Sequence, residues 1–315
     1  MMQILQDRGH EVIVGQSRID DYKTLEKEIR STQPDRIFSS TGRTHGTYEG
    51  KYYGTIDFLE LPGGLEKNLR DNLRGPVNLA LICQHHGVHL TYIGTGCIFS
   101  YDQDHQMLED REDHEGHRRP QNGFTEEDLP NFFGSGYSTI KGQTDILMHT
   151  FNKSVLNCRI RMPITGDTNP RNFITKITNY ERICSIPNSM TVLPQILPIM
   201  AHMMESGETG TYNMTNPGVI SHNQILDLYT EKVDANFTYK NFTLEEQAEI
   251  LLSGRSNNYL DTTKLEAYCT SHDLKLLSIG DAVVAALDTW ENAHEKSAKG
   301  GSCKPLQDTM TPEPL

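Results

Sequence analysis

The sequence predicts an α/β fold, a doubly wound parallel sheet followed by a smaller second domain. Three observations support this prediction. Short β-branched segments alternate with helical segments up to about residue 162, which is typical of a parallel sheet with helices on both faces. Beyond that point the alternation loosens, as expected for a domain packed beside the sheet. The chain has 315 residues, which is long enough for two joined domains.

The elements of the first domain follow in order. An apolar pattern predicts a helix at residues 1–8, and a β-branched run predicts a strand at 11–15. Asp20 and Asp21 offer an N-cap to a charged helix that ends near Ile29. The remaining predicted elements are a strand at 36–40, a glycine-studded loop at 41–64, a helix at 65–86, a strand at 88–99, a helix at 137–151 and a strand at 155–161.

Residues 102–121 differ from their surroundings. They are dense in Asp, Glu, His and Arg and contain almost no aliphatic side chains, so we expect a solvated, poorly ordered insertion. The histidines His105, His114 and His117 could suggest a metal cluster. We expect no metal site, because this segment has no scaffold that would fix the ligand geometry.

The first domain is expected to span residues 1–162, and a partly interleaved substrate domain to span 163–292. Residues 293–315 are rich in Lys, Gly, Ser, Pro and Thr and are expected to form a disordered tail. Candidate helices or strands of the second domain lie at 194–204, 210–213, 221–229, 243–251 and 278–290.

Composition excludes several classes of protein. Lys and Arg total 29 and Asp and Glu total 42, which gives a net charge of −13 and opposes generic binding to nucleic acid or anionic membranes. No apolar run approaches the roughly 20 residues that span a bilayer. The six cysteines form no CxxC pair, and the first residues of the sequence show no basic-then-apolar signal pattern, so we expect reduced thiols in a cytoplasmic protein.

Tyr137 and Lys141 form the first candidate for chemistry. A spacing of four places the phenol and the ammonium on one helical face. The cation favours the phenolate and should lower the pKa of Tyr137, making it a proton donor and acceptor near neutral pH. Because this motif is short, a surface tyrosine beside a solvated lysine is the alternative interpretation.

Thr95 and Cys97 form the second candidate. They follow the most strongly predicted strand at its carboxyl end, where doubly wound sheets bind their ligands. A period of two directs both side chains to the same side. The alternatives are an ordinary strand threonine and a small buried cysteine.

Several longer motifs then carry a family resemblance. They are TGCIF at 95–99, YSTIK at 137–141, RMPI at 161–164, NPRNFITK at 169–176, IPNSMTV at 186–192, NPGVISHN at 216–223 and RSNN at 255–258. Together they resemble the bifunctional nucleotide-sugar 3,5-epimerase/4-reductases that finish rhamnose synthesis. These are extended short-chain dehydrogenase/reductases with a Rossmann-like sheet, similar to dTDP-4-dehydrorhamnose reductase.

The resemblance implies a reaction. A 4-keto-6-deoxyhexose on UDP, or less expectedly dTDP, is inverted at C3 and C5 and then reduced at C4 with NADPH or NADH. It implies that Thr95 and Tyr137 hold the enolate oxygen while Cys97 and Lys176 carry protons. Tyr137 then protonates O4, and Lys141 lowers its pKa and holds the nicotinamide ribose. For Lys176, a solvated helix lysine is the alternative.

The resemblance also implies binding residues. On the cofactor side these are Arg18 for an adenosine 2′-phosphate, Asp20 near adenine, and Ser40, Thr41 and Gly42 where the family has Asn-Ala-Gly. Their alternatives are a surface arginine, a helix N-cap and a turn. On the substrate side they are Thr95, Asn172, Asn223 and Arg255, whose planar fork matches a diphosphate. Asn223 could instead cap a helix.

One departure from the family weakens the cofactor prediction. The family opens with a strand and a GxxGxxG turn that receives the pyrophosphate, and we expect this chain to lack both. A non-catalytic regulatory protein on the same fold, similar to the regulatory subunit of methionine adenosyltransferase, is therefore the alternative function. The sequence leaves open whether the chain forms a homodimer.

Overall fold

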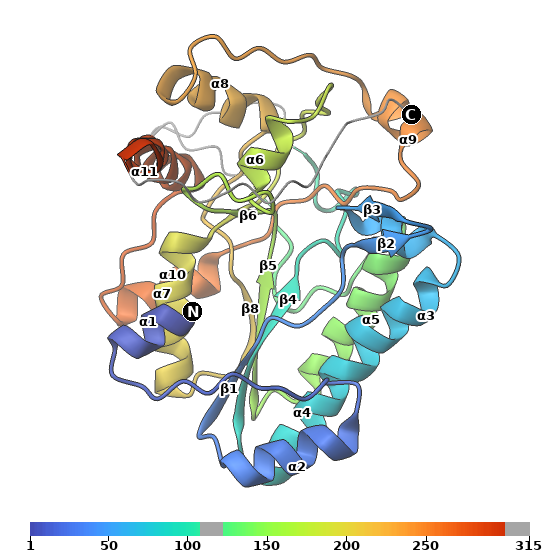
Figure 1. Ribbon diagram of the computed structural model, residues 1–315, viewed down its shortest axis with the longest axis vertical. Helices are drawn as coiled ribbons and strands as arrows, with labels where there is room; N and C mark the ends of the chain where they lie inside the picture. The colour runs from blue at the N-terminus through green and yellow to red at the C-terminus, as the bar shows by residue number, and fades with distance from the viewer. Residues whose placement is uncertain (108–121, 300–315) are drawn as a thin grey trace.

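The computed structural model describes residues 1–107 and 122–299 (Figure 1). Within these residues the main sheet has four parallel strands in the order β1-β4-β5-β8. The strands are β1 (Arg36–Ser39), β4 (His89–Thr95), β5 (Val155–Ile160) and β8 (Gly210–Asn213). Each pair is parallel and in continuous register. The predicted Rossmann-like α/β fold is confirmed.

Helices cover both faces of this sheet. One face packs against α2 (Tyr22–Thr32), α4 (Gly75–His86) and α5 (Gly136–His149). The other face packs against α1 (Met2–Asp7), α7 (Leu193–Ser206) and α10 (Thr263–Ser271). Strand alternation explains the two cores, because Leu90 and Tyr92 of β4 point to the first face whereas Leu156 and Cys158 of β5 point to the second.

Local interactions explain the start of α2 and an irregular turn before α4. Asp21 caps α2, accepting a hydrogen bond from the Thr24 amide at 3.2 Å. The helix predicted at 65–86 is continuous but contains a π-helical turn, η2 (Leu69–Arg74), between α3 (Gly64–Asn68) and α4. Pro76 has no N–H for the Asn72 carbonyl one turn earlier, and the Thr144 hydroxyl donates to that carbonyl instead at 2.6 Å.

The predicted strand at 11–15 is wrong. These residues form no strand, and Ile13 and Val14 are 57% and 61% exposed. A β-strand is stable only beside a hydrogen-bonding neighbour, and within the described residues nothing pairs with this segment.

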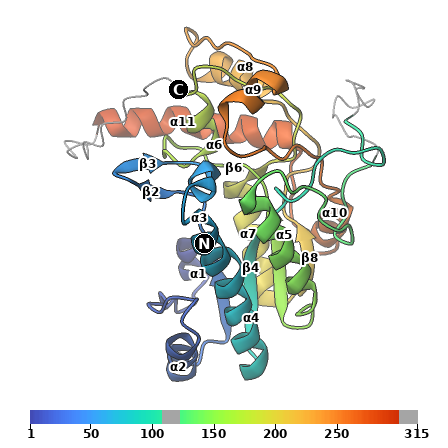
Figure 2. The ribbon, with the colours of Figure 1, turned by 90° about the vertical axis from the view of Figure 1, so that its right-hand side faces the viewer.

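The segment at 41–64 is more ordered than predicted. It contains an antiparallel hairpin of β2 (Gly46–Tyr48) and β3 (Lys51–Tyr53), followed by the 3-10 helix η1 (Ile56–Glu60). The hairpin lies beyond the carboxyl ends of the sheet strands, next to the second group of helices (Figure 2).

That second group has its own apolar core. The group consists of β6 (Pro163–Ile164), α6 (Phe173–Ile177), β7 (Thr191–Val192), α8 (His222–Lys232), α9 (Leu244–Ile250) and α11 (Ile279–Lys299). All of these elements except α9, which has no buried residue, contribute to the core. Ile174, Ile225 and Leu287 are fully buried within it. In contrast, α7 and α10 pack on the main sheet and β8 is one of its strands. The chain therefore passes between the sheet and the second group of helices more than once.

Two predictions of disorder fall partly outside the described residues. In the segment at 102–121, His114 and His117 lie outside them, whereas His105 is described and stacks on Phe124 with ring centroids 3.8 Å apart. Helix α11 continues to Lys299, so residues 293–299 are helical where a disordered tail was expected. In the part of the chain that the structure describes, no helix is long and apolar enough to cross a membrane.

Candidate active site

The site lies at the carboxyl end of β4, between the sheet and the second group of helices (Figure 1). Strand β4 is paired on both sides, with β1 and with β5, so its end is held firmly. Thr95 is the last residue of β4 and is 7% exposed. Its hydroxyl accepts a hydrogen bond from the Cys97 amide at 3.1 Å, which fixes the turn that carries the Cys97 thiol.

Helix α5 brings Tyr137 to the same place. Ser135 caps the helix by accepting from the Ser138 amide at 3.0 Å, and Glu60 of η1 accepts from the Gly136 amide at 2.7 Å. Tyr137 therefore lies in the first turn of a doubly anchored helix. The Thr95 hydroxyl lies near enough to the Tyr137 phenol to act on its pKa, in the lowering direction.

One face of α5 is fastened to the sheet at three successive turns. Tyr137 meets Thr95, and Lys141 Nζ donates a hydrogen bond to the Tyr92 hydroxyl of β4. One turn later, Asp145 accepts two hydrogen bonds from the fully buried Arg159 of β5, at 3.0 Å and 2.7 Å. The spacing of four in the sequence therefore produces a line of side chains, each with a partner on a strand.

Electrostatics at Tyr137 differ from the sequence-based expectation. Burial raises the pKa of Tyr137 to about 12, and the charge of Lys141 offsets this only in part. The expected net lowering is wrong because removing the phenolate from water outweighs the attraction of one cation. Burial also lowers the pKa of Lys141, while Tyr137, Asp145 and Cys97 act in the opposite direction. Without substrate, Tyr137 is thus a protonated hydrogen-bond donor.

Lys176 lies on α6, in the second group of helices. Burial and the neighbouring Arg171 both lower its pKa. The His45 imidazole lies near enough to Arg171, Arg43 and Lys176 that these cations, together with burial, lower its pKa as well. In the described residues no hydrogen bond or ion pair joins Lys176 to Tyr137. His45 was missed by sequence reasoning, although it closely follows a strand end.

Arg255 is held in an ion pair across the site. Its Nη2 lies 2.6 Å from Asp57 of η1. The same carboxylate accepts from the Ser253 amide at 3.0 Å and the Ser253 hydroxyl at 2.8 Å. The segment is also pinned to the start of α5, because the Gly254 amide donates to the Gly134 carbonyl at 2.8 Å. Asp57, another residue that sequence reasoning missed, is only 8% exposed.

The two asparagines expected to bind substrate differ in their side-chain hydrogen bonds. The Asn172 amide caps α6 and holds the preceding turn through hydrogen bonds to the backbone of Thr165, Asp167 and Ile174. Asn223 is not the cap of α8, because Ser221 forms that cap in a capping box. The Asn223 Oδ1 atom is buried without a hydrogen-bond partner in the described structure.

A loop follows the end of β1, at the residues predicted to bind the cofactor. Ser40, Thr41 and Gly42 follow this strand, and the Thr41 hydroxyl is hydrogen-bonded to that of Ser39 at 2.7 Å. Gly42 has a φ of +156°, and a Cβ there would lie 3.0 Å from the Asn72 side chain. Glycine is therefore required at a turn where the backbone is closely approached.

Four arginines gather beside this loop around two aspartates. Arg18 lies 2.8 Å from Asp20 and 3.2 Å from Asp71. The other contacts are Arg43 to Asp71, Arg70 to Asp71 at 2.8 Å and Arg74 to Asp20 at 3.6 Å. Hydrogen bonds from Arg70 and Arg43 hold the pKa of Asp71 at about 2 despite burial. The four arginines outnumber Asp20, Asp71 and the nearby Glu66, and this excess of positive charge favours an anionic ligand.

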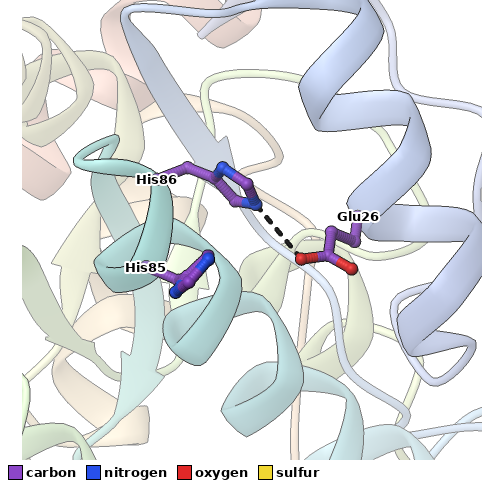
Figure 3. A group of neighbouring side chains, drawn as sticks. All are labelled: Glu26, His85 and His86. Carbon is purple, nitrogen blue, oxygen red and sulfur yellow. Dashed lines mark hydrogen bonds and ion pairs between the residues drawn. The ribbon is translucent and has the colours of Figure 1, made fainter.

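One group of potential metal ligands occurs elsewhere in the described residues. Glu26 of α2 and His85 and His86 at the end of α4 have ligand atoms within 4.8 Å of one another (Figure 3). His86 Nε2 lies 3.2 Å from the Glu26 carboxylate. These histidines immediately precede the amino end of β4, whereas Thr95 ends that strand. The group is a contact between α2 and α4 near the amino end of β4, whereas the site lies at the carboxyl end of this strand.

The chain is similar to proteins of rhamnose synthesis. No protein-family model matches it. It shares 47% identity and a TM-score of 0.82 with the L780 UDP-rhamnose synthase of Acanthamoeba polyphaga mimivirus, over 91% of this chain and 93% of that one. It is 43% identical to the bifunctional dTDP-4-dehydrorhamnose 3,5-epimerase/dTDP-4-dehydrorhamnose reductase of Arabidopsis thaliana, covering 80% of this chain and 77% of the plant protein. A dTDP-4-dehydrorhamnose reductase of Clostridium acetobutylicum shares the fold, at 16% identity and a TM-score of 0.69.

Proposed function

The chain belongs to the family of bifunctional 4-dehydrorhamnose 3,5-epimerase/4-reductases, and from this we propose that it converts a nucleotide-bound 4-keto-6-deoxyglucose into the L-rhamnose nucleotide with NAD(P)H. The observation that carries the proposal is the convergence of Thr95, Tyr137 and Lys141 at the end of β4, with Cys97 beside them. A non-catalytic protein would not need a hydroxyl, a phenol, an amine and a thiol in one place.

Epimerisation uses the acidity that the C4 ketone gives to the hydrogens on C3 and C5. A base removes one proton, the electron pair moves to O4, and a proton then returns to the opposite face of the same carbon. The Thr95 hydroxyl and the protonated Tyr137 phenol stabilise the negative O4 by donating hydrogen bonds. Cys97 and Lys176 are proposed to carry the protons.

Reduction uses the same donors. The hydride that C4 receives would come from a reduced nicotinamide when this cofactor is bound. Tyr137 gives its proton to O4, and the adjacent Lys141 ammonium stabilises the tyrosinate that results. We propose that Lys141 also holds the nicotinamide ribose. The raised pKa of Tyr137 suits this step because the residue must enter it protonated.

We assign NADPH as the preferred cofactor. The group of Arg18, Arg43, Arg70 and Arg74 carries surplus positive charge beside the loop that follows β1, and a guanidinium matches the geometry of a phosphate monoester. We expect Arg18→Ala to raise the KM for NADPH about tenfold and to leave the KM for NADH within about twofold. Equal effects on both cofactors would contradict the assignment.

For the substrate we assign UDP as the nucleotide. The support is the 47% identity to a UDP-rhamnose synthase. Arg255 would meet the diphosphate once it leaves Asp57. The free thiols of Cys83, Cys97, Cys158, Cys184 and Cys269 support a reducing compartment, and we assign the cytoplasm.

The decisive experiment is turnover of UDP-4-keto-6-deoxyglucose with NADPH, followed by identification of the product. We expect UDP-rhamnose, and we expect Tyr137→Phe to lower kcat at least a hundredfold, the scale of a general acid. Tyr101→Phe is the matched control, because the Tyr101 hydroxyl donates to the Pro187 carbonyl at 2.9 Å and, within the described residues, makes no hydrogen bond to Thr95, Tyr137 or Lys141. Wild-type protein that leaves both substrate and cofactor unchanged would refute the function.

A further inference from the structure

Tyr92 places a polar group inside an apolar core. The residue is 1% exposed and packs among aliphatic side chains such as Leu79, Ile82 and Met148. Its hydroxyl receives a hydrogen bond from Lys141 Nζ, which also lies 4.7 Å from the centre of the Tyr92 ring. The phenol therefore contacts the ammonium with both its oxygen and its aromatic face.

Neither partner would be buried without the other. Lys141 is 4% exposed, and an ammonium in such a place loses its hydration unless protein groups replace it. The other charged or titratable groups facing it are Tyr137 and Asp145 on α5 and Cys97 after β4. Asp145 is already bound by two hydrogen bonds to Arg159. Tyr92 is thus the neutral acceptor that completes the surroundings of Lys141.

We propose that Tyr92 is a positioning residue for the reduction, because it holds the Lys141 ammonium in place beside Tyr137. This rests on the proposed function, in which Lys141 stabilises the tyrosinate. β4 and the turn that follows it then supply three groups. Thr95 meets the substrate oxygen, Cys97 exchanges a proton, and Tyr92 orients the lysine that serves Tyr137.

The physical consequence concerns where Lys141 lies and whether it stays charged. Burial already lowers the pKa of Lys141. Replacing the Tyr92 hydroxyl with hydrogen removes an acceptor of the ammonium and none of the neutral amine's own interactions. The charged form is therefore penalised further, and Lys141 should lose its proton at lower pH in Tyr92→Phe. The Tyr137 phenolate then loses the charge of the Lys141 ammonium, which stabilises it.

The first experiment compares Tyr92→Phe with Tyr101→Phe, both of which remove one phenolic oxygen and keep the ring. We expect Tyr92→Phe to lower kcat about tenfold and to move the alkaline limb of its pH profile to lower pH by about one unit, with KM for the nucleotide sugar unchanged. Tyr101→Phe should keep the wild-type kcat and limb. An alkaline limb in Tyr92→Phe that coincides with the wild-type limb would overturn the proposal.

A second experiment does not depend on turnover. Labelling with acetic anhydride over a range of pH, followed by mass spectrometry of the peptide that contains Lys141, measures the pKa of that amine. We expect a lower value in Tyr92→Phe than in wild type and no change in Tyr101→Phe. Identical titration in all three proteins would overturn the role of Tyr92 even if the enzyme were active. If wild type showed no turnover but this shift appeared, the proposed function would fail and the Tyr92 contact would stand.

Discussion

The two sides of the active site are built in different ways. On the sheet side, Thr95, Tyr137 and Lys141 come from one central strand and one helix, and their partners are buried. On the substrate side, the Asp57–Arg255 pair joins residues 198 positions apart, and the Arg255 side chain remains 26% exposed. Lys176 there belongs to a helix of five residues.

This difference follows from what each side must do. Proton transfer requires groups held within a fraction of an ångström, which a paired strand and a capped helix provide. Recognition of a bulky nucleotide sugar requires groups that can exchange one partner for another, and loops and short helices suit that task. We therefore expect changes on the sheet side to cost stability, and changes on the substrate side to alter binding with little cost in stability.

The largest effect should come from breaking the buried pair of α5 and β5. Arg159→Met leaves the Asp145 carboxylate without its main partner, and we expect a loss of about 3–5 kcal/mol in the free energy of unfolding. Urea denaturation followed by circular dichroism measures this. Arg182→Met is the control, because its pair with Glu246 is exposed with atoms 3.7 Å apart and should contribute at most about 1 kcal/mol.

The same pair gives a dependence on pH. His149 and Arg159 hold the pKa of Asp145 well below its usual range despite burial. A depressed pKa in the folded state means that the stabilisation is complete above the usual pKa of Asp and is lost as pH falls toward the depressed value. The difference in stability between wild type and Arg159→Met should thus be constant from pH 6 to 8 and shrink in acid. A difference that grew in acid would contradict this sign.

The second largest effect should separate the two half-reactions. Cys97→Ala or Lys176→Ala should slow the uptake of deuterium at C3 and C5 by roughly a hundredfold, because these residues are proposed to move protons and not hydride. Reduction of a ketone that is already epimerised should continue. Cys184→Ala is the matched control, because Cys184 is a buried thiol whose charged neighbour is Glu245 of α9. Undiminished uptake in both variants would remove the two residues from the mechanism.

The same contrast explains how much the sequence could predict. Tyr137 and Lys141 were found because helical spacing is local, and Thr95 and Cys97 because a strand end follows directly from the pattern. The partner of Lys141 could not be found, because Tyr92 looks like any core aromatic until α5 is packed on β4. The predicted lowering of the Tyr137 pKa is wrong for the same reason. Burial raises this pKa, and the degree of burial depends on tertiary packing.

On the substrate side, more of the prediction depended on distant parts of the chain. The guanidinium of Arg255 suggests a diphosphate ligand from the sequence alone. Its ion pair with Asp57, however, joins two segments that no local sequence pattern connects. The prediction of a strand at 11–15 is wrong because a strand needs a hydrogen-bonded neighbouring strand, and the local amino-acid composition does not show whether one is present. The hairpin at 46–53 was overlooked because its strands have only three residues each.

The smallest effect should come from Asp57→Asn. The amide oxygen of asparagine can still accept from the Ser253 amide, so the segment stays attached to η1, but the charge that holds Arg255 is removed. We expect the free energy of unfolding to change by less than about 1 kcal/mol. The freed guanidinium should bind the substrate diphosphate more readily, lowering KM for the nucleotide sugar about threefold at unchanged kcat. Arg255→Met should raise the same KM. If Asp57→Asn instead raised KM as much as Arg255→Met does, Asp57 would be an orienting partner of Arg255 during binding and not its competitor.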